Sequence, residues 1–521
     1  MAHTPRGAVA AGHRLTAEAA SEVLAAGGNA FDALIAALWT ACVVEPVLCS
    51  PGGGGFLMAR PEGRAPAVLD FFVQTPRRPQ PPEALDFHEV IADFGTDQQA
   101  FHIGLGSIAT PGFVRGLYAM QRALASLPMR ELVAPAVQHA REGVALDELQ
   151  AYIFSIVAPI YLATPEARAV FESPTRPGHT LQAGEILRQP DLADTLEVLA
   201  IEGDDLFYRG EIAALIEQQC ADGGGHLRRE DLERYRVAER QPLMGRLVGH
   251  RLWTNPPPSS GGILIAFALA LLDGLPPGWL PPQGPQRALR IARLLALTHQ
   301  ARIAHHVDSP TADRDDEYAL LDPGLLARYR EELLDAPEAM RGTTHVSVVD
   351  GAGNLAAATV SNGEGCGHLV PGTGIMLNNM LGEEDLNPHG FHRWQPDRRM
   401  TSMMAPGILR LADGAEVVLG SGGSNRIRSA LLQTILHLAE GRSLEAAVQA
   451  PRLHVEGDLL SIEGGFDDDT VDALVAAWPE HVQWQNRNLF FGGVHAVLRE
   501  PGGGLVAAGD PRRAGEARIV A

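Results

Sequence analysis

The stretch TTHVSVVD, residues 343–350, decides the fold of this chain. Its alternating, β-branched residues are typical of a β-strand, which we predict over residues 344–349. A second strand-like run, LAAATVS at residues 355–361, follows after the link Gly351-Ala352-Gly353-Asn354. Short links of this composition join the two strands of a hairpin. We therefore expect a pair of antiparallel strands with a hydroxyl residue, Thr343, at the entrance to the first.

Thr343 follows the loop-like stretch DAPEAMRG. A threonine hydroxyl is a weak nucleophile unless a base lies beside it, and cutting the chain before the threonine supplies its own α-amine as that base. An α-amine has a pKa of roughly 7.7–8.0, close to the working pH at which a general base is most effective. Cleavage between Gly342 and Thr343 predicts an amide-cleaving enzyme. The alternative is an ordinary strand threonine, which the octapeptide alone favours.

The composition is that of a globular protein without polyanionic partners. The chain has 521 residues, 45% hydrophobic and 20% charged, with a formal net charge of −21. This length allows two or more core-forming units, or one large globule. Binding to nucleic acid or to an anionic membrane needs clustered Lys and Arg, and no such cluster appears in the sequence. We expect neither partner.

The cysteines and the first residues predict a protein of a reducing compartment. Four scattered cysteines, with no CxxC pair, fit neither a zinc site nor a disulfide framework, and we expect free or buried thiols: Cys42, Cys49, Cys220 and Cys366. The N-terminal residues lack the pattern of a signal peptide. The apolar run at residues 31–48 contains Asp32, Glu45 and Pro46, which predicts a buried helix and a turn instead of a membrane span. We expect a cytoplasmic location.

The pattern along the chain predicts sheets covered by helices. Residues 15–44 have helical periodicity interrupted at Gly27-Gly28-Asn29, and residues 110–300 are mostly helical in pattern. After residue 343, strand-like runs alternate with helical ones. The strands are expected at residues 407–411, 416–419 and 494–499, and the helices at 428–439 and 443–450. Such alternation favours layered sheets with helices outside.

Four short motifs suggest chemistry or its absence. The run Gly52-Gly53-Gly54-Gly55 lacks the Lys-Ser or Lys-Thr of a phosphate loop, so we expect close backbone packing. Gly420-Ser421-Gly422-Gly423-Ser424 does not match GxSxG, although its backbone N–H groups suit an oxyanion hole. His305-His306-Val307-Asp308 has no metal-binding spacing, and we expect surface residues there. Glu383-Glu384-Asp385 predicts either a solvated loop or a carboxylate that receives a substrate ammonium group.

Eight runs, in this order, resemble the gamma-glutamyltranspeptidase family of N-terminal nucleophile hydrolases: GGNAFDA, PGGGGF, ATPG, PPPSSGG, TTHVSVVD, PGTGIMLNN, GSGGSNR and GDPR. The resemblance covers nearly the whole chain. It implies an α+β fold, a four-layer αββα sandwich, and self-cleavage into a large subunit of residues 1–342 and a small subunit of residues 343–521, together one intertwined globular unit. It implies no cofactor and no metal.

The resemblance also assigns the site. By this resemblance we expect Thr343 to be the residue of self-cleavage and the nucleophile, and Gly422 with Gly423 matches the oxyanion-hole pair. Ser361 takes the place of a second hydroxyl that hydrogen-bonds the nucleophile. The remaining matches are substrate-binding positions. Asn362 is one of them, and the paired hydroxyls of Thr401 and Ser402 are expected to hold a substrate carboxylate.

Departures from the family pattern concern the substrate. In the run DFFVQTP the family's carboxylate-binding arginine is replaced by Phe72, and loss of a bidentate arginine contact costs roughly 2–4 kcal/mol of binding. The family's glutamine and aspartate near the substrate amine become Met380 and Glu383. Glu383 keeps the charge, whereas Met380 loses the amide. Three arginines are candidates to compensate: Arg77, Arg78 and Arg426.

Three functions follow from this pattern. The first is a self-processing γ-glutamyl hydrolase or transferase for glutathione-like compounds, with water or an acceptor amine resolving the acyl-enzyme. The second is an acylase for another amide, with Phe72 in an apolar acyl site. The third is an uncut, non-catalytic relative, against which Thr343, Ser361 and the glycine pair argue.

Overall fold

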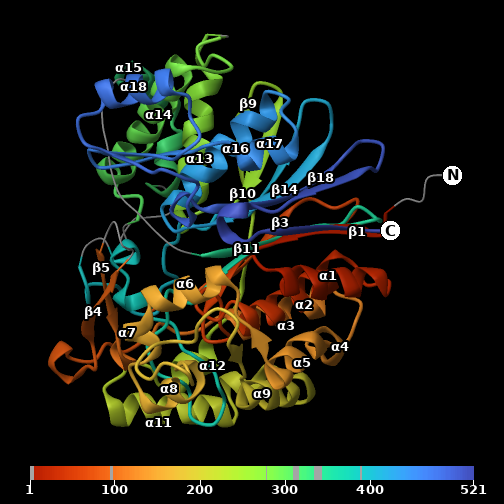
Figure 1. Cartoon of the computed structure of the whole chain (residues 1–521), viewed down its shortest axis with the longest axis vertical. Coiled ribbons are helices and arrows are strands. Elements are labelled where there is room, and N and C mark those ends of the chain that lie inside the picture. The colour runs from red at the N-terminus through yellow and green to blue at the C-terminus, as the bar shows by residue number, and fades with distance from the viewer. Residues whose placement is uncertain (1–4, 94–97, 277, 309–315, 334–342, 388–389) are drawn as a thin grey trace.

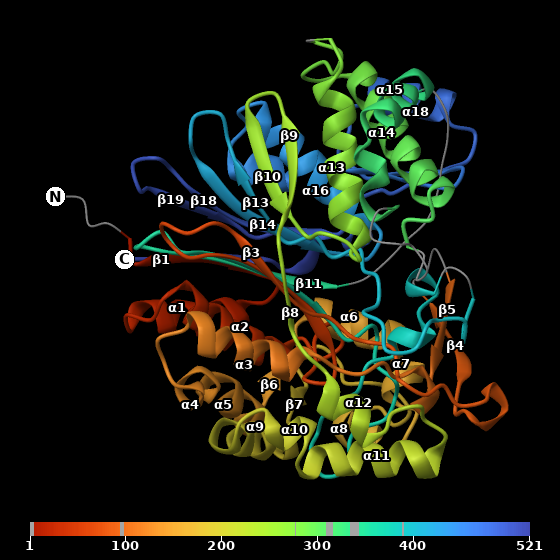
Figure 2. The ribbon, with the colours of Figure 1, turned by 180° about the vertical axis from the view of Figure 1, so that it is seen from behind.

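The computed structural model describes residues 5–93, 98–276, 278–308, 316–333, 343–387 and 390–521. Two β-sheets lie face to face in the middle of the molecule, and a layer of helices covers the outer face of each (Figures 1 and 2). This arrangement confirms the predicted four-layer αββα sandwich.

The larger sheet has seven strands and contains the predicted hairpin. In spatial order they are β20 (Glu516–Val520), β1 (Gly7–Ala11), β11 (Thr344–Asp350), β12 (Leu355–Ser361), β2 (Gly54–Arg60), β3 (Ala67–Phe71) and β8 (Ala238–Arg240). All neighbours are antiparallel, and Thr344 pairs with Val360 across the hairpin. The strand that begins after Thr343 is therefore an inner strand, buried on both faces.

The second sheet has six antiparallel strands and supplies the glycine pair. Their order is β19 (Leu505–Ala508), β18 (Gly493–Arg499), β14 (Glu416–Gly422), β13 (Gly407–Arg410), β10 (His250–Thr254) and β9 (Leu243–Leu247). Strands β11 and β12 pack on β14. At this contact a Cβ atom on Gly420 would lie 2.2 Å from the ring of His345, so the absence of a side chain on Gly420 makes room for that ring between the sheets.

Helices cover the sheets from opposite sides. The first sheet is covered by α1 (Arg14–Ala25), α2 (Ala30–Val44) and α3 (Phe113–Leu124), and the second by α13 (Ser260–Asp273), α16 (Arg426–Ala439) and α17 (Leu444–Gln449). Helix α14 (Pro285–Ala304) packs on α13. Further helices are α4 (Met129–Leu132), α5 (Ala134–Glu142), α6 (Glu148–Ile156), α7 (Ala158–Tyr161), α8 (Pro165–Phe171), α9 (Pro190–Glu202), α10 (Asp205–Tyr208), α11 (Glu211–Gly223), α12 (Arg229–Arg234), α15 (Pro323–Glu332) and α18 (Asp468–Ala477). Small sheets pair β4 (His88–Asp93) with β5 (Gln98–Ile103), β6 (Val144–Ala145) with β7 (Ile186–Leu187), and β15 (Leu453–Glu456) and β17 (His481–Gln483) with β16 (Leu459–Ile462).

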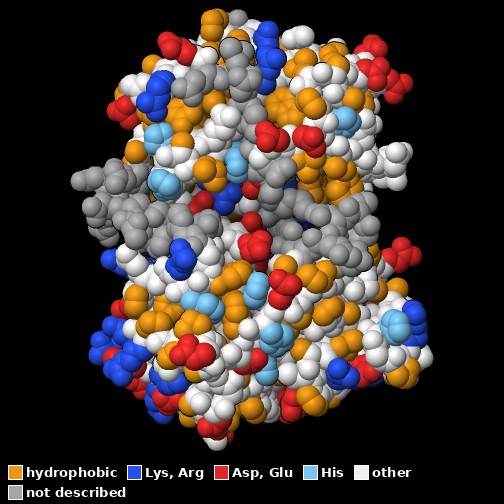
Figure 3. Space-filling model, turned by 90° about the vertical axis from the view of Figure 1, so that its left-hand side faces the viewer, with side chains coloured by type: hydrophobic (Ala, Val, Ile, Leu, Met, Phe, Trp, Pro, Cys, Tyr) orange, Lys and Arg blue, Asp and Glu red, His pale blue; other side chains and the backbone are white. Residues whose placement is uncertain are grey.

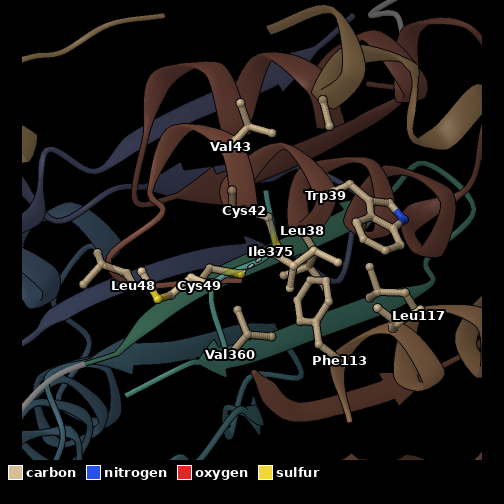
Figure 4. Packing of buried hydrophobic residues seen from close by; sticks show 14 of the residues in the cluster. Leu38, Trp39, Cys42, Val43, Leu48, Cys49, Phe113, Leu117, Val360 and Ile375 are labelled. Carbon is tan, nitrogen blue, oxygen red and sulfur yellow. Dashed lines mark hydrogen bonds between the residues drawn. The ribbon is translucent and has the colours of Figure 1, made fainter. Parts of the chain in front are cut away.

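Helix α2 is the centre of one hydrophobic core. Every residue of α2 is buried, and Asn29 with Asp32 forms a capping box at its start. Its side chains pack between the sheet and the outer helices (Figure 4). Cys42 and Cys49 lie in this core with their sulfurs 3.3 Å apart, and all four cysteines are free and buried. The predicted buried helix and free thiols are confirmed.

The four consecutive glycines serve backbone packing, as expected. A Cβ atom on Gly52 would lie 2.3 Å from the carbonyl oxygen of Met376, and one on Gly53 would lie 2.3 Å from that of Ser361. Side chains would therefore separate this loop from the end of β12. Among the described residues, no helix combines the length and the apolar character needed to cross a membrane.

Sequence periodicity misses part of the second sheet. Strands β9 and β10 fall inside the region of residues 110–300 that we expected to be mostly helical. Both strands are five residues long. They pair with each other, and β10 also pairs with β13. Strand β1, with the sequence GAVAA, is likewise fixed by its partners β11 and β20.

Candidate active site

Thr343 directly precedes β11 and is held tightly against the second sheet. It is 4% exposed, and its carbonyl oxygen accepts a hydrogen bond of 3.1 Å from Arg513 Nη1. A Cβ atom on Gly422 would lie 1.6 Å from this same oxygen. Only glycine therefore allows β14 to approach Thr343 so closely. The predicted cleavage site joins Thr343 to Gly342, which lies outside the described residues.

The glycine pair is followed by a turn into helix α16. Gly423 has a φ of +122°, a conformation that side chains strongly disfavour, and Ser424 has a φ of +44°. Asp385 fixes this turn, because its carboxylate accepts hydrogen bonds of 2.7 Å from Ser424 Oγ and 3.1 Å from Asn425 Nδ2. The turn that follows the proposed oxyanion donors is thus anchored by a second loop.

Six of the nine predicted site residues line one hollow: Phe72, Thr343, Ser361, Glu383, Thr401 and Ser402. Acidic and basic side chains gather at the waist of the molecule, between its two halves (Figure 3). Gly422 packs against the carbonyl group of Thr343, and Gly423 follows it in the chain. The structure therefore brings residues from five separate stretches of sequence to Thr343.

Ser361 and Asn362 occupy different surroundings. Ser361 is the last residue of β12, and its Oγ accepts a hydrogen bond of 3.0 Å from the N–H of Gly363. Asn362 is fully buried, and its side chain lies beside the Tyr161 hydroxyl. It is not among the described residues that line the hollow, so a direct role in substrate binding remains a prediction.

The paired hydroxyls line the hollow and also have partners within the protein. Thr401 Oγ1 donates to Asp308 Oδ1 over 3.4 Å, and Ser402 Oγ accepts a hydrogen bond of 3.1 Å from the N–H of Met404. The carbonyl oxygen of Ser402 accepts further bonds from Ser259 Oγ at 2.8 Å and from the N–H of Ser260 at 2.9 Å. Their loop is thereby tied to the start of α13.

The acidic run divides between the hollow and solvent. Glu383 and Asp385 line the hollow, whereas Glu384 is exposed. Glu383 Oε1 lies 2.9 Å from where a Cβ atom on Gly363 would be, a residue with a φ of +67°. Exposed Glu384 fits the solvated-loop interpretation, whereas the role of a carboxylate that receives a substrate ammonium group stays a prediction.

Phe72 gives the hollow an aromatic wall. Its ring stacks on Phe56 with centroids 5.4 Å apart, and the side chain is 1% exposed. Met380, which replaces the family's glutamine, also lines the hollow. The three arginines considered as substitutes are not among the described lining residues. They bind elsewhere: Arg77 to Asp397, Arg78 to Glu230 and Arg426 to the carbonyl of Phe490.

A different arginine reaches the hollow, and the sequence did not indicate it. Arg302 of α14 lines the hollow together with Asp308, and the Arg302 Nε to Asp308 Oδ2 distance is 2.5 Å. Arg302 Nη1 also lies 3.4 Å from Glu456 Oε1. Our expectation that residues 305–308 lie on the surface is wrong for Asp308, which is 8% exposed. The partner of Asp308, Arg302, lies six residues earlier on α14, and the helical periodicity of the sequence predicts only packing for that position.

The chain is similar to known proteins over nearly its whole length. The gamma-glutamyltranspeptidase family profile matches residues 16–520. A glutathione hydrolase proenzyme of Bacillus subtilis strain 168 is 29% identical over 504 residues, which cover 90% of this chain and 84% of the relative. An acylase ACY 1 proenzyme of Pseudomonas sp. strain SE83 is also 29% identical, over 525 residues that cover 96% and 91%. The two relatives have different activities in their names but the same sequence identity to this chain, so identity does not distinguish between those activities.

Solved structures agree on the fold. A cephalosporin acylase from Bacillus halodurans has a TM-score of 0.84 at 24% identity, covering 99% of this chain and 96% of that chain. A gamma-glutamyltranspeptidase from Pseudomonas nitroreducens, complexed with L-DON, has a TM-score of 0.53 at 28% identity, covering 61% and 92%. Because the family profile spans nearly all of the sequence, this chain belongs to the gamma-glutamyltranspeptidase family.

Proposed function

We propose that this protein is a self-processing amidohydrolase or acyltransferase with Thr343 as its nucleophile. The observation that carries this proposal is the position of Thr343, which lines the hollow while Gly422 packs against its carbonyl group. Homologues named as proenzymes, among glutathione hydrolases and acylases alike, support a single precursor. In this proposal residues 1–342 form a large subunit and residues 343–521 a small one.

The proposed reaction begins with the chain itself. Thr343 Oγ attacks the carbonyl carbon of Gly342, the peptide C–N bond breaks, and the acyl group moves to the threonine oxygen as an ester. Water hydrolyses this ester, which leaves a carboxylate on Gly342 and a free amine on Thr343. The new amine is then the general base for every later turnover.

The same hydroxyl then acts on the substrate. The α-amine takes the proton of Thr343 Oγ as this oxygen bonds to the substrate carbonyl carbon, and the charge on the carbonyl oxygen is stabilised by N–H groups of Gly422 and Gly423. Removing such a donor typically costs roughly 10²–10³ in rate. The amine of the substrate leaves with the proton, and water or an acceptor amine resolves the acyl-enzyme.

Two acyl groups are candidates. A γ-glutamyl group is favoured by the family and by Glu383, whose carboxylate suits a substrate ammonium group, with Thr401 and Ser402 at its carboxylate. A less polar acyl group is favoured by the stacked Phe72 and by Met380, which replace an arginine and an amide. Purified protein assayed against γ-glutamyl anilides and N-acyl amino acids decides between them. A strong preference for the γ-glutamyl compounds would refute the less polar pocket.

Intact mass spectrometry tests self-processing directly. We expect two fragments, residues 1–342 and 343–521, from the wild type and one uncut chain from Thr343→Ala. Thr343→Ser keeps a hydroxyl and should still be cut. Active wild-type protein consisting of one uncut chain would contradict the mechanism. A cytoplasmic location stays a prediction, which cell fractionation tests.

A further inference from the structure

A buried carboxyl group, that of Glu45, contacts Thr344, the residue that follows Thr343. Glu45 caps the end of α2 and is 1% exposed. Its Oε2 accepts a hydrogen bond of 3.0 Å from Thr344 Oγ1, and its Oε1 accepts one of 2.8 Å from Thr16 Oγ1. Burying an ionised carboxyl is costly unless it is both hydrogen-bonded and paired with an opposite charge, and the reaction proposed above gives this one no task.

The packing around this carboxyl fixes its position. A Cβ atom on Gly12 would lie 2.8 Å from Glu45 Oε2 and 3.0 Å from Thr344 Oγ1. The backbone at Gly12 thus closes over the hydrogen bond between the two side chains. Thr344 itself is 3% exposed and pairs with Val360 in the sheet. The Glu45–Thr344 contact is therefore a rigid link between α2 and the start of β11.

A second anchor holds the preceding residue. Arg513 Nη1 donates to the carbonyl oxygen of Thr343 at 3.1 Å, and Arg513 is 6% exposed. Burial lowers the pKa of Arg513 to about 10, so its guanidinium remains charged at neutral pH. Two consecutive residues are thus held by buried groups, Thr343 through its backbone and Thr344 through its side chain.

Chain cleavage makes such anchors necessary. Newly formed chain ends are poorly ordered unless they are tied down, whereas a nucleophile displaced by about 1 Å can lose roughly 10²-fold in rate. We infer that Glu45 is a positioning residue that holds Thr343 in its reactive position by binding the side chain of Thr344. This inference rests on the proposed function.

The charge of Glu45 should also affect the pKa of the α-amine that cleavage creates on Thr343. Burial raises the pKa of Glu45 to about 7, against lowering by the Thr16 and Thr344 hydrogen bonds; Asp147 also raises it and Arg513 lowers it. The thiol of Cys42 also interacts with it, and His495 Nε2 faces the same place, 3.5 Å from where a Cβ atom on Gly12 would lie. Ionised Glu45 stabilises an ammonium group on nearby Thr343, because opposite charges favour each other's charged forms. Its removal should lower the pKa of the new amine.

The first test compares two substitutions at Thr344. Thr344→Val removes the hydroxyl with almost no change in shape, whereas Thr344→Ser keeps it. We expect roughly a 10- to 100-fold loss of kcat in Thr344→Val, with KM changed less than about twofold, and near wild-type kcat in Thr344→Ser. Thr40→Val is the matched control, because Thr40 is buried in α2 and its hydroxyl donates to the carbonyl of Ala36 within that helix.

The second test uses Glu45→Gln, which keeps a hydrogen-bond acceptor but loses the charge. We expect the acidic limb of its kcat profile to move to lower pH, since the amine becomes a weaker base. A purely structural role would not move this limb. Thermal unfolding of each variant identifies any loss of fold, and the pH profile decides the question even if Thr344→Val is unstable.

The outcomes separate this inference from the proposed function. If mass spectrometry shows that wild-type protein is not cut before Thr343, the proposed function fails and this inference with it. If the wild type is cut and active, the inference alone is overturned by equal kcat values for Thr344→Val and Thr344→Ser together with an unshifted limb in Glu45→Gln.

Discussion

Replacing Gly422 by alanine tests whether the close approach of the two sheets positions Thr343. The new Cβ atom would lie 1.6 Å from the carbonyl oxygen of Thr343 and 2.6 Å from its carbon, and both are backbone atoms. To reach 3.0 Å, below which real Cβ contacts essentially never occur, the Cβ–oxygen distance of 1.6 Å must grow by about 1.4 Å. Thr343 or the glycine turn therefore has to move.

A displacement of this size should stop the chemistry. Misplacing a reacting group by about 1 Å can cost roughly 10²-fold, so we expect kcat of Gly422→Ala to fall at least about 100-fold and self-cleavage to slow markedly. Self-cleavage is followed by denaturing gels over time, and kcat with whichever amide the wild type hydrolyses.

The control is Gly502→Ala, because a Cβ atom on Gly502 meets nothing within 4 Å. This variant should behave as the wild type in both assays. If Gly422→Ala matched the wild type within about twofold in self-cleavage and in kcat, the argument that this glycine fixes Thr343 would be wrong.

Three further predictions concern stability. Phe72→Ala empties a fully buried site beside Phe56, and denaturant unfolding should show a loss of about 3–5 kcal/mol; a loss under about 1 kcal/mol would contradict the packing. Arg302→Met leaves Asp308 buried without its ion pair, which should cost about 3–5 kcal/mol in the same assay, and the double variant with Asp308→Asn should recover part of it. Folding raises the pKa of Glu45 from 4.5 to about 7, so the folded state binds the Glu45 proton more tightly than the unfolded state does. The stabilisation that this proton provides is present below pH 4.5 and is lost as the pH rises to about 7. The unfolding free energy of Glu45→Gln relative to wild type should therefore rise by up to about 3 kcal/mol from pH 4.5 to above 7; a difference independent of pH would contradict it.

Local sequence predicted the elements whose pattern is set by their own residues. The strand at residues 355–361 has the predicted bounds, and the helices at residues 14–25 and 30–44 meet at the predicted glycines. Strand β1 was not predicted, because GAVAA has weak strand propensity and is held by pairing with β11 and β20. The order of the strands also required the structure, since it depends on contacts between distant segments.

The candidate site was predictable where motifs mark it. Thr343, Ser361 and Glu383 were expected from the family pattern, and all three line the same hollow. Arg302 and Glu45 were missed for a common reason. Arg302 lies on α14 and Glu45 directly follows α2, and the sequence predicts only packing at both places. The partner of each, Asp308 or Thr344, comes close only in the folded chain.

The interleaving of strands in the two sheets has a consequence for handling the protein. The larger sheet takes β1, β2, β3 and β8 from before residue 343 and β11, β12 and β20 from after it, and the smaller sheet is also shared. Once cut, such a molecule would unfold into two separate polypeptides, so its melting temperature would increase with protein concentration. Refolding from denaturant would then be a bimolecular reaction that dilution slows, whereas the uncut precursor refolds as a single molecule.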